Sequence, residues 1–248
     1  MNIKIINVTK KSLFSEFSPV TKQEWIEKVN VDLKGADFDK TLVWKNLSDI
    51  NIKPFYNTED NITQLKNTGE NSQSLVNYRL IDACCNESGN KLALKAIEEG
   101  MNGLIFKICD NCKASDLLQG INLNEITVSF ILGNNAVEFA KDFFSYASKN
   151  GVIIENLKGY FNTALISNYV TTATVEAAAF DTVTELVKLA DKYPNYKAIT
   201  ISGTEYLDSG ANQVQEIAYT LNSLVYVIDE LTNRGIEVQS IFNNLNLI

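Results

Sequence analysis

The sequence predicts an α/β fold in which a parallel sheet is built from repeated strand–helix units. From about residue 75, apolar runs of strand length alternate with stretches whose apolar residues recur every three to four positions. The first three expected strands begin at residues 76, 103 and 126, which are 27 and 23 residues apart. This spacing fits a unit that leads to a parallel neighbour, which takes roughly 30 residues. We therefore expect two parts: an N-terminal arm, residues 1–74, and the repeating α/β part, residues 75–248.

The arm is expected to contain one short helix and one extended segment. Residues 21–24 (Thr-Lys-Gln-Glu) have the spacing of a capping box, which predicts a helix start, and Gly35 marks the helix end. The apolar side of this helix is formed by Trp25, Ile26, Val29 and Leu33. Trp44 and residues 52–56 follow as an extended segment, because Pro54 interrupts any helix or central strand.

In the α/β part, the expected strands lie at residues 76–81, 103–108, 126–132, 198–202 and 245–248, with a weak one at 152–154. The stretches between them predict amphipathic helices, and the longest of these ends near Gly235. Its apolar stripe consists of Val214, Ile217, Ala218, Leu221, Val225 and Ile228. We interpret all of the stripes as core-facing, because a surface helix buries its apolar face against the rest of the fold.

The number of units leaves two architectures open. A closed barrel of eight units takes about 250 residues by itself, whereas about 173 residues follow the arm here. These hold five units and the first strand of a sixth, and the sequence ends on the apolar run at 245–248. The alternatives are an open, doubly wound sheet and the front part of a longer barrel protein.

Composition excludes several classes of function. The 22 basic and 30 acidic residues give a net charge of −8, whereas a protein that binds a nucleic-acid backbone needs a basic face. The sequence contains no histidine, which removes Ser-His-Asp and Cys-His nucleophile systems, His-ligated metal centres and any imidazole base. No segment approaches the roughly 20 apolar residues of a membrane span, and the N-terminus has no signal-peptide core. We expect a cytoplasmic protein that binds neither nucleic acid nor membrane.

Four cysteines occur in a chain large enough to build its own core, so disulfide bonds are not expected. Cys109 and Cys112 form a CxxC motif, which in redox proteins opens a helix. A zinc site would need Cys84 and Cys85 as the second ligand pair, and adjacent cysteines are a poor chelating pair. We interpret all four as ordinary cysteines, with a thiol-redox module on Cys109 and Cys112 as the alternative.

Parallel α/β folds place their binding sites at the carboxyl ends of the strands. Asp82 ends the first expected strand, and Asp110 lies just past the second. Ser202 and Thr204 lie where the fifth strand passes into a loop rich in small and hydroxyl residues, before the longest helix. These four are the expected barrel-mouth residues. No phosphate-binding glycine loop of known type accompanies them.

Two stretches of the sequence resemble the methylmalonyl-CoA mutase family and, within it, the small subunits. The first is residues 17–60, with the Trp25 helix, the Asp-Leu-Lys-Gly turn at 32–35, Leu-Val-Trp at 42–44 and the closing IKPFYNTED. The second is residues 201–231, ISGTEYLDSGANQVQEIAYTLNSLVYVIDEL, a strand, a loop and a helix with an Ala-Tyr-x-Leu motif. Their order and separation agree with the family, so the resemblance spans nearly the whole chain.

The resemblance implies a substrate-binding (β/α)₈ barrel of TIM-barrel type, here incomplete with about five to six units and preceded by the N-terminal arm and helix. In that family the large subunit threads coenzyme A through its barrel. It isomerises methylmalonyl-CoA and succinyl-CoA by a radical route that uses adenosylcobalamin. The small subunit has the same architecture, is held to bind no cofactor, and pairs with the large one. A separate cobalamin-binding domain is expected to be absent here.

The sequence departs from the catalytic pattern of the family it resembles. Catalytic subunits carry Arg-Gln-Tyr-Ala-Gly after the first barrel strand, whereas residues 80–85 here read Leu-Ile-Asp-Ala-Cys-Cys, without the tyrosine. The family's active-site histidine and its cobalamin-ligating Asp-x-His-x-x-Gly motif need histidine, which this sequence lacks. We therefore expect no catalytic, cofactor-binding or metal-binding residues. The expected role is a partner or scaffold of the large subunit in a heterodimer.

Contact with that partner is expected from aromatic residues of the arm, which lie outside the repeating pattern. They are Phe14, Phe17, Trp25, Trp44 and Tyr56, with Phe55 beside them. The alternative is that these side chains close the bottom of the chain's own barrel. An alternative function is an acyl-CoA-binding barrel of the same isomerase family, with residual substrate binding. It would need basic residues near the mouth, and the supply is small: Arg79 and Lys107 on strands, and Arg234 as the one other arginine.

Overall fold

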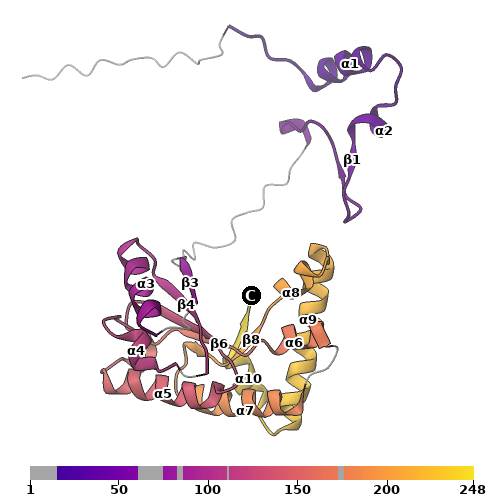
Figure 1. Ribbon diagram of the computed structural model, residues 1–248. Coiled ribbons are helices and arrows are strands. Elements are labelled where there is room, and N and C mark those ends of the chain that lie inside the picture. Colours follow the sequence, from indigo (N-terminus) through magenta and orange to yellow (C-terminus); the bar gives the residue numbers. More distant parts are fainter. Residues whose placement is uncertain (1–15, 61–74, 83–85, 111, 173–175) are drawn as a thin grey trace, which may run out of the picture. The chain divides into compact units, whose positions relative to one another are not determined.

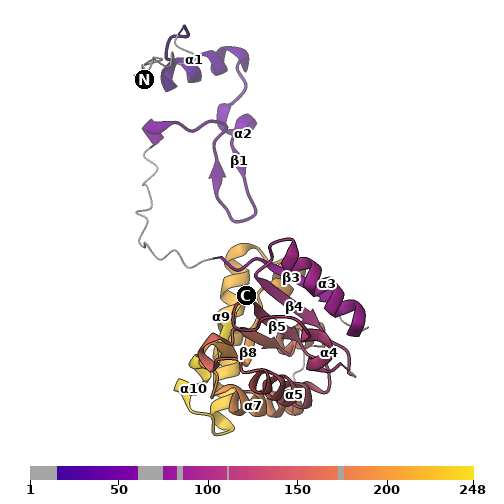
Figure 2. The same ribbon diagram turned by 90° about the vertical axis from the view of Figure 1, so that its left-hand side faces the viewer.

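The computed structural model describes residues 16–60, 75–82, 86–110, 112–172 and 176–248 of the chain. It divides into two compact units, Met1–Glu70 and Asn71–Ile248, which we call the N-terminal unit and the sheet unit. Figures 1 and 2 show their elements. Among the described residues, no helix combines the length and the apolar character that crossing a membrane requires.

The N-terminal unit contains the predicted helix, α1 (Lys22–Asp32). Its capping box is confirmed: the Thr21 side chain accepts from the Glu24 backbone N–H, and the Glu24 carboxylate accepts from the Thr21 backbone N–H at 2.8 Å. The chain leaves the helix through Gly35 at φ +91°, where a glycine is favoured. The remaining elements are α2 (Phe38–Leu42), an antiparallel hairpin of β1 (Trp44–Lys45) and β2 (Asn51–Ile52), and a 3₁₀ turn, η1 (Thr58–Asp60).

The sheet unit is built on parallel strands that follow one another in chain order. They are β3 (Tyr78–Asp82), β4 (Gly103–Lys107), β5 (Thr127–Ile131), β6 (Gly159–Asn162), β7 (Tyr196–Lys197), β8 (Ile199–Ile201) and β9 (Leu245–Leu247). Strands β3 to β7 form one sheet in the order 3-4-5-6-7, and β8 pairs with β9. Because β7 and β8 are consecutive and separated only by Ala198, the two sheets continue each other as one wall of six strand positions.

This order decides between the two architectures that the sequence left open. A doubly wound sheet reverses its strand order at a switch point, so that helices cover both faces. Here the order never reverses, and Figures 1 and 2 show the helices along the outer side of the strands. That is the construction of a TIM-barrel wall. In the part of the chain that the structure describes, β3 and β9 do not pair, so the wall is not closed.

The outer layer consists of helices of very different length. They are α3 (Asn86–Glu98), α4 (Ala114–Leu118), α5 (Ala136–Lys149), α6 (Leu165–Thr172), α7 (Ala177–Ala190), α8 (Thr204–Asp208), α9 (Gln213–Asn233) and α10 (Val238–Asn243), with a 3₁₀ turn, η2 (Ile154–Asn156). The core lies between this layer and the sheet. One row of neighbouring strand residues, Ile81, Phe106, Phe130 and Phe161, is buried, and Phe130 contacts Phe139 and Phe143 of α5.

The weak strand expected at 152–154 is wrong. That stretch passes into η2, and the fourth strand is β6, which begins five residues later. Gly159, at the start of β6, has φ +145°, and a Cβ there would lie 1.9 Å from the Val128 carbonyl oxygen. The chain can therefore approach β5 only with a glycine at this position. A short strand that opens on glycine has little apolar pattern, which is why periodicity did not find it.

The interpretation of the longest apolar stripe as core-facing is also wrong in most of its length. Helix α9 buries Ser223, Val227 and Leu231. Val214, Ile217, Leu221 and Val225 of the predicted stripe are 50–69% exposed. The stripe lies on a different side of the helix from the face that meets the sheet. Periodicity shows that a helix is amphipathic, but the neighbours decide which side is covered.

Candidate functional site

The carboxyl ends of the strands bring polar side chains into one row on the inner face of the wall. The register pairs Asp82 with Lys107, Lys107 with Ile131, and Ile131 with Asn162. This row is one residue beyond the buried row, so its side chains point to the opposite face of the sheet. Asp82 and Lys107 are exposed, and Asn162 is half-buried. A carboxylate, an ammonium and an amide therefore lie along this edge, as the sequence predicted for Asp82.

The amino ends of the same strands are filled instead by tyrosines. A Cβ on Gly103 would lie only 2.6 Å from Cδ1 of the Tyr78 ring, so the glycine makes room for this ring. The ring centroids of Tyr78 and Tyr160 are 6.3 Å apart. The Tyr160 backbone N–H donates to Ser129 Oγ at 3.2 Å. Burial raises the pKa of Tyr78 and Tyr160, and raises that of the fully buried Tyr196 well above 10. At this end Tyr160 and Tyr196 are buried and Tyr78 is 38% exposed, whereas the exposed Asp82 and Lys107 lie at the carboxyl end.

Ser202 and Thr204 lie together, but apart from Asp82. Ser202 follows β8 directly and is buried, and its Oγ accepts from the Thr204 backbone N–H at 3.2 Å. This bond supports the turn into α8. Asp82 belongs to β3, at the other end of the strand order. The four expected mouth residues therefore do not form one cluster in this structure.

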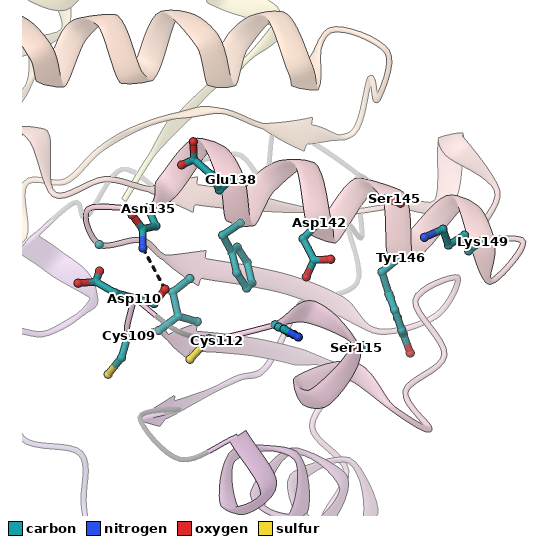
Figure 3. A pocket seen from close by; sticks show the side chains of 14 residues that line it. Cys109, Asp110, Cys112, Ser115, Asn135, Glu138, Asp142, Ser145, Tyr146 and Lys149 are labelled. Carbon is teal, nitrogen blue, oxygen red and sulfur yellow. Dashed lines mark hydrogen bonds between the residues drawn. The ribbon is translucent and has the colours of Figure 1, made fainter.

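Asp110 lies in a separate cavity of about 650 Å³ between the loop after β4 and helix α5. Figure 3 shows its lining side chains. Asn135 Nδ2 donates to the Asp110 backbone carbonyl at 3.0 Å, and Asp142 Oδ2 accepts from the Ala114 backbone N–H at 2.8 Å. A Cβ on Gly133 would lie 3.2 Å from Asp110 Oδ1, so the glycine leaves space for the carboxylate.

This cavity is polar and mixed in charge. Asp110, Glu138 and Asp142 contribute carboxylates, and Lys113 and Lys149 contribute ammonium groups. Asp142 caps the start of α4 through the bond to Ala114, which accounts for its position structurally. Among the described residues, no group of three or more histidine, cysteine, aspartate or glutamate side chains is placed to hold a metal ion. The cavity therefore presents carboxylates, ammonium groups and hydroxyls side by side.

The CxxC motif lines the same cavity without closing on itself. Cys109 is disulfide-bonded, which contradicts the expectation that disulfides are absent, whereas Cys112 keeps its thiol. The two cysteines are therefore not bonded to each other, and Figure 3 shows their sulfur atoms apart. A dithiol–disulfide cycle within the motif would require these two sulfur atoms to pair.

The aromatic residues expected to contact a partner differ in their surroundings. Trp25 stacks on Phe55 with centroids 4.9 Å apart and meets Phe38 edge-on at 6.4 Å. Phe17 and Trp44 are 68% and 64% exposed. Tyr56 is half-exposed, and its hydroxyl accepts from the Lys53 backbone N–H at 2.9 Å. Phe14 lies outside the described residues.

Sequence reasoning did not single out Lys107 and Asn162 as neighbours of Asp82 on the inner face. The alternation of strand residues predicts this placement once the register is known, because Lys107 lies one residue beyond the buried Phe106. Sequence reasoning also missed the cavity at α5, which depends on how two loops meet. The exposed side of α9 is recognisable in the sequence as an apolar pattern, but the pattern predicts that this side faces the core.

Comparison with known proteins identifies the family. The family model of methylmalonyl-CoA mutase matches residues 87–248, well over half of the chain. The chain belongs to the methylmalonyl-CoA mutase family. The match covers every strand of the wall from β4 onward. The incomplete barrel wall is therefore the part of the fold by which this member is identified.

One relative extends the likeness to the N-terminal unit, and others cover about half of the chain. The methylmalonyl-CoA mutase small subunit of Porphyromonas gingivalis is 26% identical over 254 aligned residues, which cover 95% of this chain and 41% of that protein. The small subunit of Streptomyces virginiae is 25% identical over 52% of the chain and 21% of its own length. The 2-hydroxyisobutanoyl-CoA mutase large subunit of Aquincola tertiaricarbonis is 26% identical over 57% of the chain and 25% of its own length. The chain thus spans less than half the length of these relatives.

Proposed function

We propose that this chain acts as a small-subunit-type partner of a catalytic methylmalonyl-CoA mutase large subunit and performs no isomerisation itself. The observation that carries the proposal is the likeness to a methylmalonyl-CoA mutase small subunit over 95% of the chain, which includes the N-terminal unit. In this role the chain is a component of an assembly that interconverts methylmalonyl-CoA and succinyl-CoA. Its contribution is to stabilise or position the catalytic subunit.

The residues of this chain do not fit the cofactor that the family implies. Adenosylcobalamin supplies a radical when bound, and the family's cobalamin motif contributes a histidine ligand. The sequence contains no histidine, and the inner row offers an aspartate, a lysine and an asparagine. We therefore assign cobalamin to the large subunit and derive no step through it here.

The N-terminal unit supports a partner role because it leaves large apolar side chains uncovered. Trp44 is 64% exposed and Leu47 is 97% exposed. Exposed aromatic and aliphatic residues that lie close together mark interaction surfaces. We propose Phe17, Trp44 and Tyr56 as contacts with the large subunit, together with Phe14. Trp25, which stacks on Phe55, positions this surface more than it contributes to it.

Co-expression with a methylmalonyl-CoA mutase large subunit from the same organism tests the proposal. We expect one heterodimer peak on gel filtration, and Trp44→Ser should weaken the association. The matched control is Leu92→Ser, which replaces a half-exposed apolar residue on α3 of the sheet unit. Two separate peaks for the wild-type chain would refute the partner role.

Residual acyl-CoA binding is the outcome that would replace this function. The inner row offers Lys107 as its ammonium group, and the other positions of that row are acidic, amide or apolar. Calorimetric titration of the isolated chain with propionyl-CoA should show no saturable heat. Micromolar binding that Lys107→Ala removes would favour the acyl-CoA-binding barrel over the scaffold.

A further inference from the structure

A second cavity, of about 460 Å³, lies between helices α6, α8 and α9 of the sheet unit. Figure 1 shows these three helices beside one another. Side-chain bonds join them: the Ser167 hydroxyl of α6 donates to the Glu205 carboxylate of α8, and the hydroxyl oxygens of Tyr206 and Ser223, on α8 and α9, are 2.6 Å apart. The cavity is therefore bounded by helices that are tied to one another. Its lining consists of Ile166, Tyr169, Tyr206, Asn222, Ser223, Val225, Tyr226 and Asp229.

Most of this lining is aromatic or aliphatic, and two of its three tyrosine rings are supported by other rings. Tyr226 meets Phe180 of α7 edge-on, with centroids 5.6 Å apart. Tyr206 packs on Tyr219 with centroids 5.4 Å apart. Rings that are already held in place lose little conformational freedom when a ligand packs on them. The cavity therefore suits a ligand with an apolar or aromatic body.

The lining contains one charged side chain, that of Asp229 on α9. In the part of the chain that the structure describes, this carboxylate forms no ion pair and no hydrogen bond. Arg234, five residues further along, donates instead to Asp181 at 3.1 Å and to Glu230 at 2.6 Å. The negative charge of Asp229 is thus not compensated by a neighbouring cation of the described chain, and it favours a ligand with a positive charge.

Hydroxyl and amide groups add hydrogen-bond acceptors to the carboxylate. The Tyr206 and Ser223 hydroxyls bond to each other, and each oxygen keeps a lone pair whichever of them donates. Ser223 is 5% exposed, so this pair lies at the inner end of the cavity, whereas Asn222 is exposed at the rim. A primary ammonium group has three N–H donors and no acceptor, so these groups match it. A ligand carboxylate would instead meet the like charge of Asp229.

We propose that the cavity between α6, α8 and α9 binds a small organic amine, in which a protonated amino group is attached to an apolar or aromatic body. The ammonium group pairs with Asp229, and the body packs against Tyr169, Tyr206 and Tyr226. An ammonium group near the face of a tyrosine ring is also attracted by that ring. The site is independent of the partner role proposed above, because none of its residues belongs to the N-terminal unit.

The first test is a ligand-detected NMR titration of the full chain with three probes of similar shape and different charge. They are 2-phenylethylamine, which is positive, 2-phenylethanol, which is neutral, and 3-phenylpropionate, which is negative. We expect saturable binding of the amine, and at least about fivefold weaker binding of the other two, because only the amine forms an ion pair with Asp229. Equal binding of the three probes, or no saturable binding of the amine below about 10 mM, would overturn the proposal.

Variants then locate the site. Asp229→Asn keeps the shape of the side chain but removes its charge, so the variant should bind the amine and the alcohol about equally. The matched control is Glu216→Gln, which removes one negative charge from the same helix about 20 Å away and should leave the preference for the amine unchanged. Tyr169→Ala removes ring surface and should weaken the binding of both probes.

Two results of the variant series would contradict the proposal. Amine binding that Asp229→Asn leaves unchanged would show that the carboxylate takes no part. An equal loss in Asp229→Asn and Glu216→Gln would show that the amine follows the net charge of −8 and not this site. Unchanged far-UV circular dichroism would show that the variants fold. Because the isolated chain is used throughout, the result does not depend on whether a large subunit associates.

Discussion

The N-terminal unit and the sheet unit differ in how completely their side chains are buried. In the sheet unit, large side chains such as Phe106, Phe130 and Phe143 are completely buried in one continuous core. Among residues 16–60 of the N-terminal unit, no side chain is buried to that extent. Its order depends on the α1 capping box, the Trp25–Phe55 stack and the ion pair between Lys22 and Asp60.

This difference predicts which unit would gain more stability from being covered by another molecule. Residues 16–60, where no described side chain is buried, gain little stability from hydrophobic burial, which dominates folding free energy. The N-terminal unit therefore has the most to gain from a partner that covers Phe17 and Trp44. The chain also offers a way to watch each unit alone. Its two tryptophans, Trp25 and Trp44, both lie in the N-terminal unit, whereas the long helices that dominate circular dichroism lie in the sheet unit.

The largest expected effect is a break in the sheet-unit core. Phe130→Ala should destabilise this unit by about 3–5 kcal/mol, because the fully buried ring contacts four other aromatic rings and leaves a cavity. Urea unfolding followed by circular dichroism measures it. Phe55→Ala, in the N-terminal unit, should shift that transition by no more than about 0.5 kcal/mol. Equal shifts for both variants would show that the units share one core.

The second effect is a loss of sheet-unit stability at alkaline pH. Burial raises the pKa of Tyr196 well above 10, so the folded chain keeps this proton where the unfolded chain releases it. The stabilisation is complete below pH 10 and declines as the pH rises above it. Unfolding at a series of alkaline pH values, followed by circular dichroism, measures the slope. Tyr196→Phe should reduce the dependence of stability on alkaline pH, and the dependence that remains is due to Tyr78 and Tyr160. An unchanged dependence would contradict the assignment of this effect to Tyr196.

A smaller effect should be confined to the N-terminal unit. Thr21→Ala removes the capping box of α1 and should cost about 1 kcal/mol in the transition seen by tryptophan fluorescence. Asn212→Ala removes the same kind of box from α9, so it should shift only the circular-dichroism transition. A shift of both transitions by either variant would mean that the units unfold together.

The smallest effect distinguishes the units at acidic pH. Hydrogen bonds from the backbone and side chain of Thr21 hold the pKa of Glu24 below its ordinary 4.5, and the bond from Lys22 lowers that of Asp60. The stabilisation from a lowered carboxyl pKa is present above the ordinary value and is lost as the pH falls through the folded value. Tryptophan fluorescence should therefore change at a pH below 4.5 while the sheet unit persists. Glu24→Gln should reduce this acid response. A response identical to that of wild type would contradict the role of Glu24 in stabilising the N-terminal unit.

Much of the fold follows from local patterns in the sequence. The α1 helix begins where Thr21 and Glu24 satisfy each other's backbone groups, a rule that involves only four consecutive residues. Strands β3, β4, β5 and β8 lie where apolar runs predict them. In β4, β5 and β8 the run is needed because these strands are mostly buried. The apolar pattern does not predict strand β6, because Gly159 is required there by its close approach to Val128, which is remote in sequence. For the same reason, the sequence placed Asp82 at a strand end but did not join it to Lys107.

The sequence by itself determined the family, the repeated strand–helix units and the absence of imidazole chemistry. Each follows from which residues occur and at what spacing. Tertiary structure decided the rest: that the strands keep chain order and form a barrel wall, that Asp110 and Ser202 lie at separate places, and that Val214, Ile217, Leu221 and Val225 of α9 are exposed. The physical reason is that an apolar face is favourable only when something packs against it. The position of an apolar face in the sequence does not specify which element packs against it, or whether that element belongs to the same molecule.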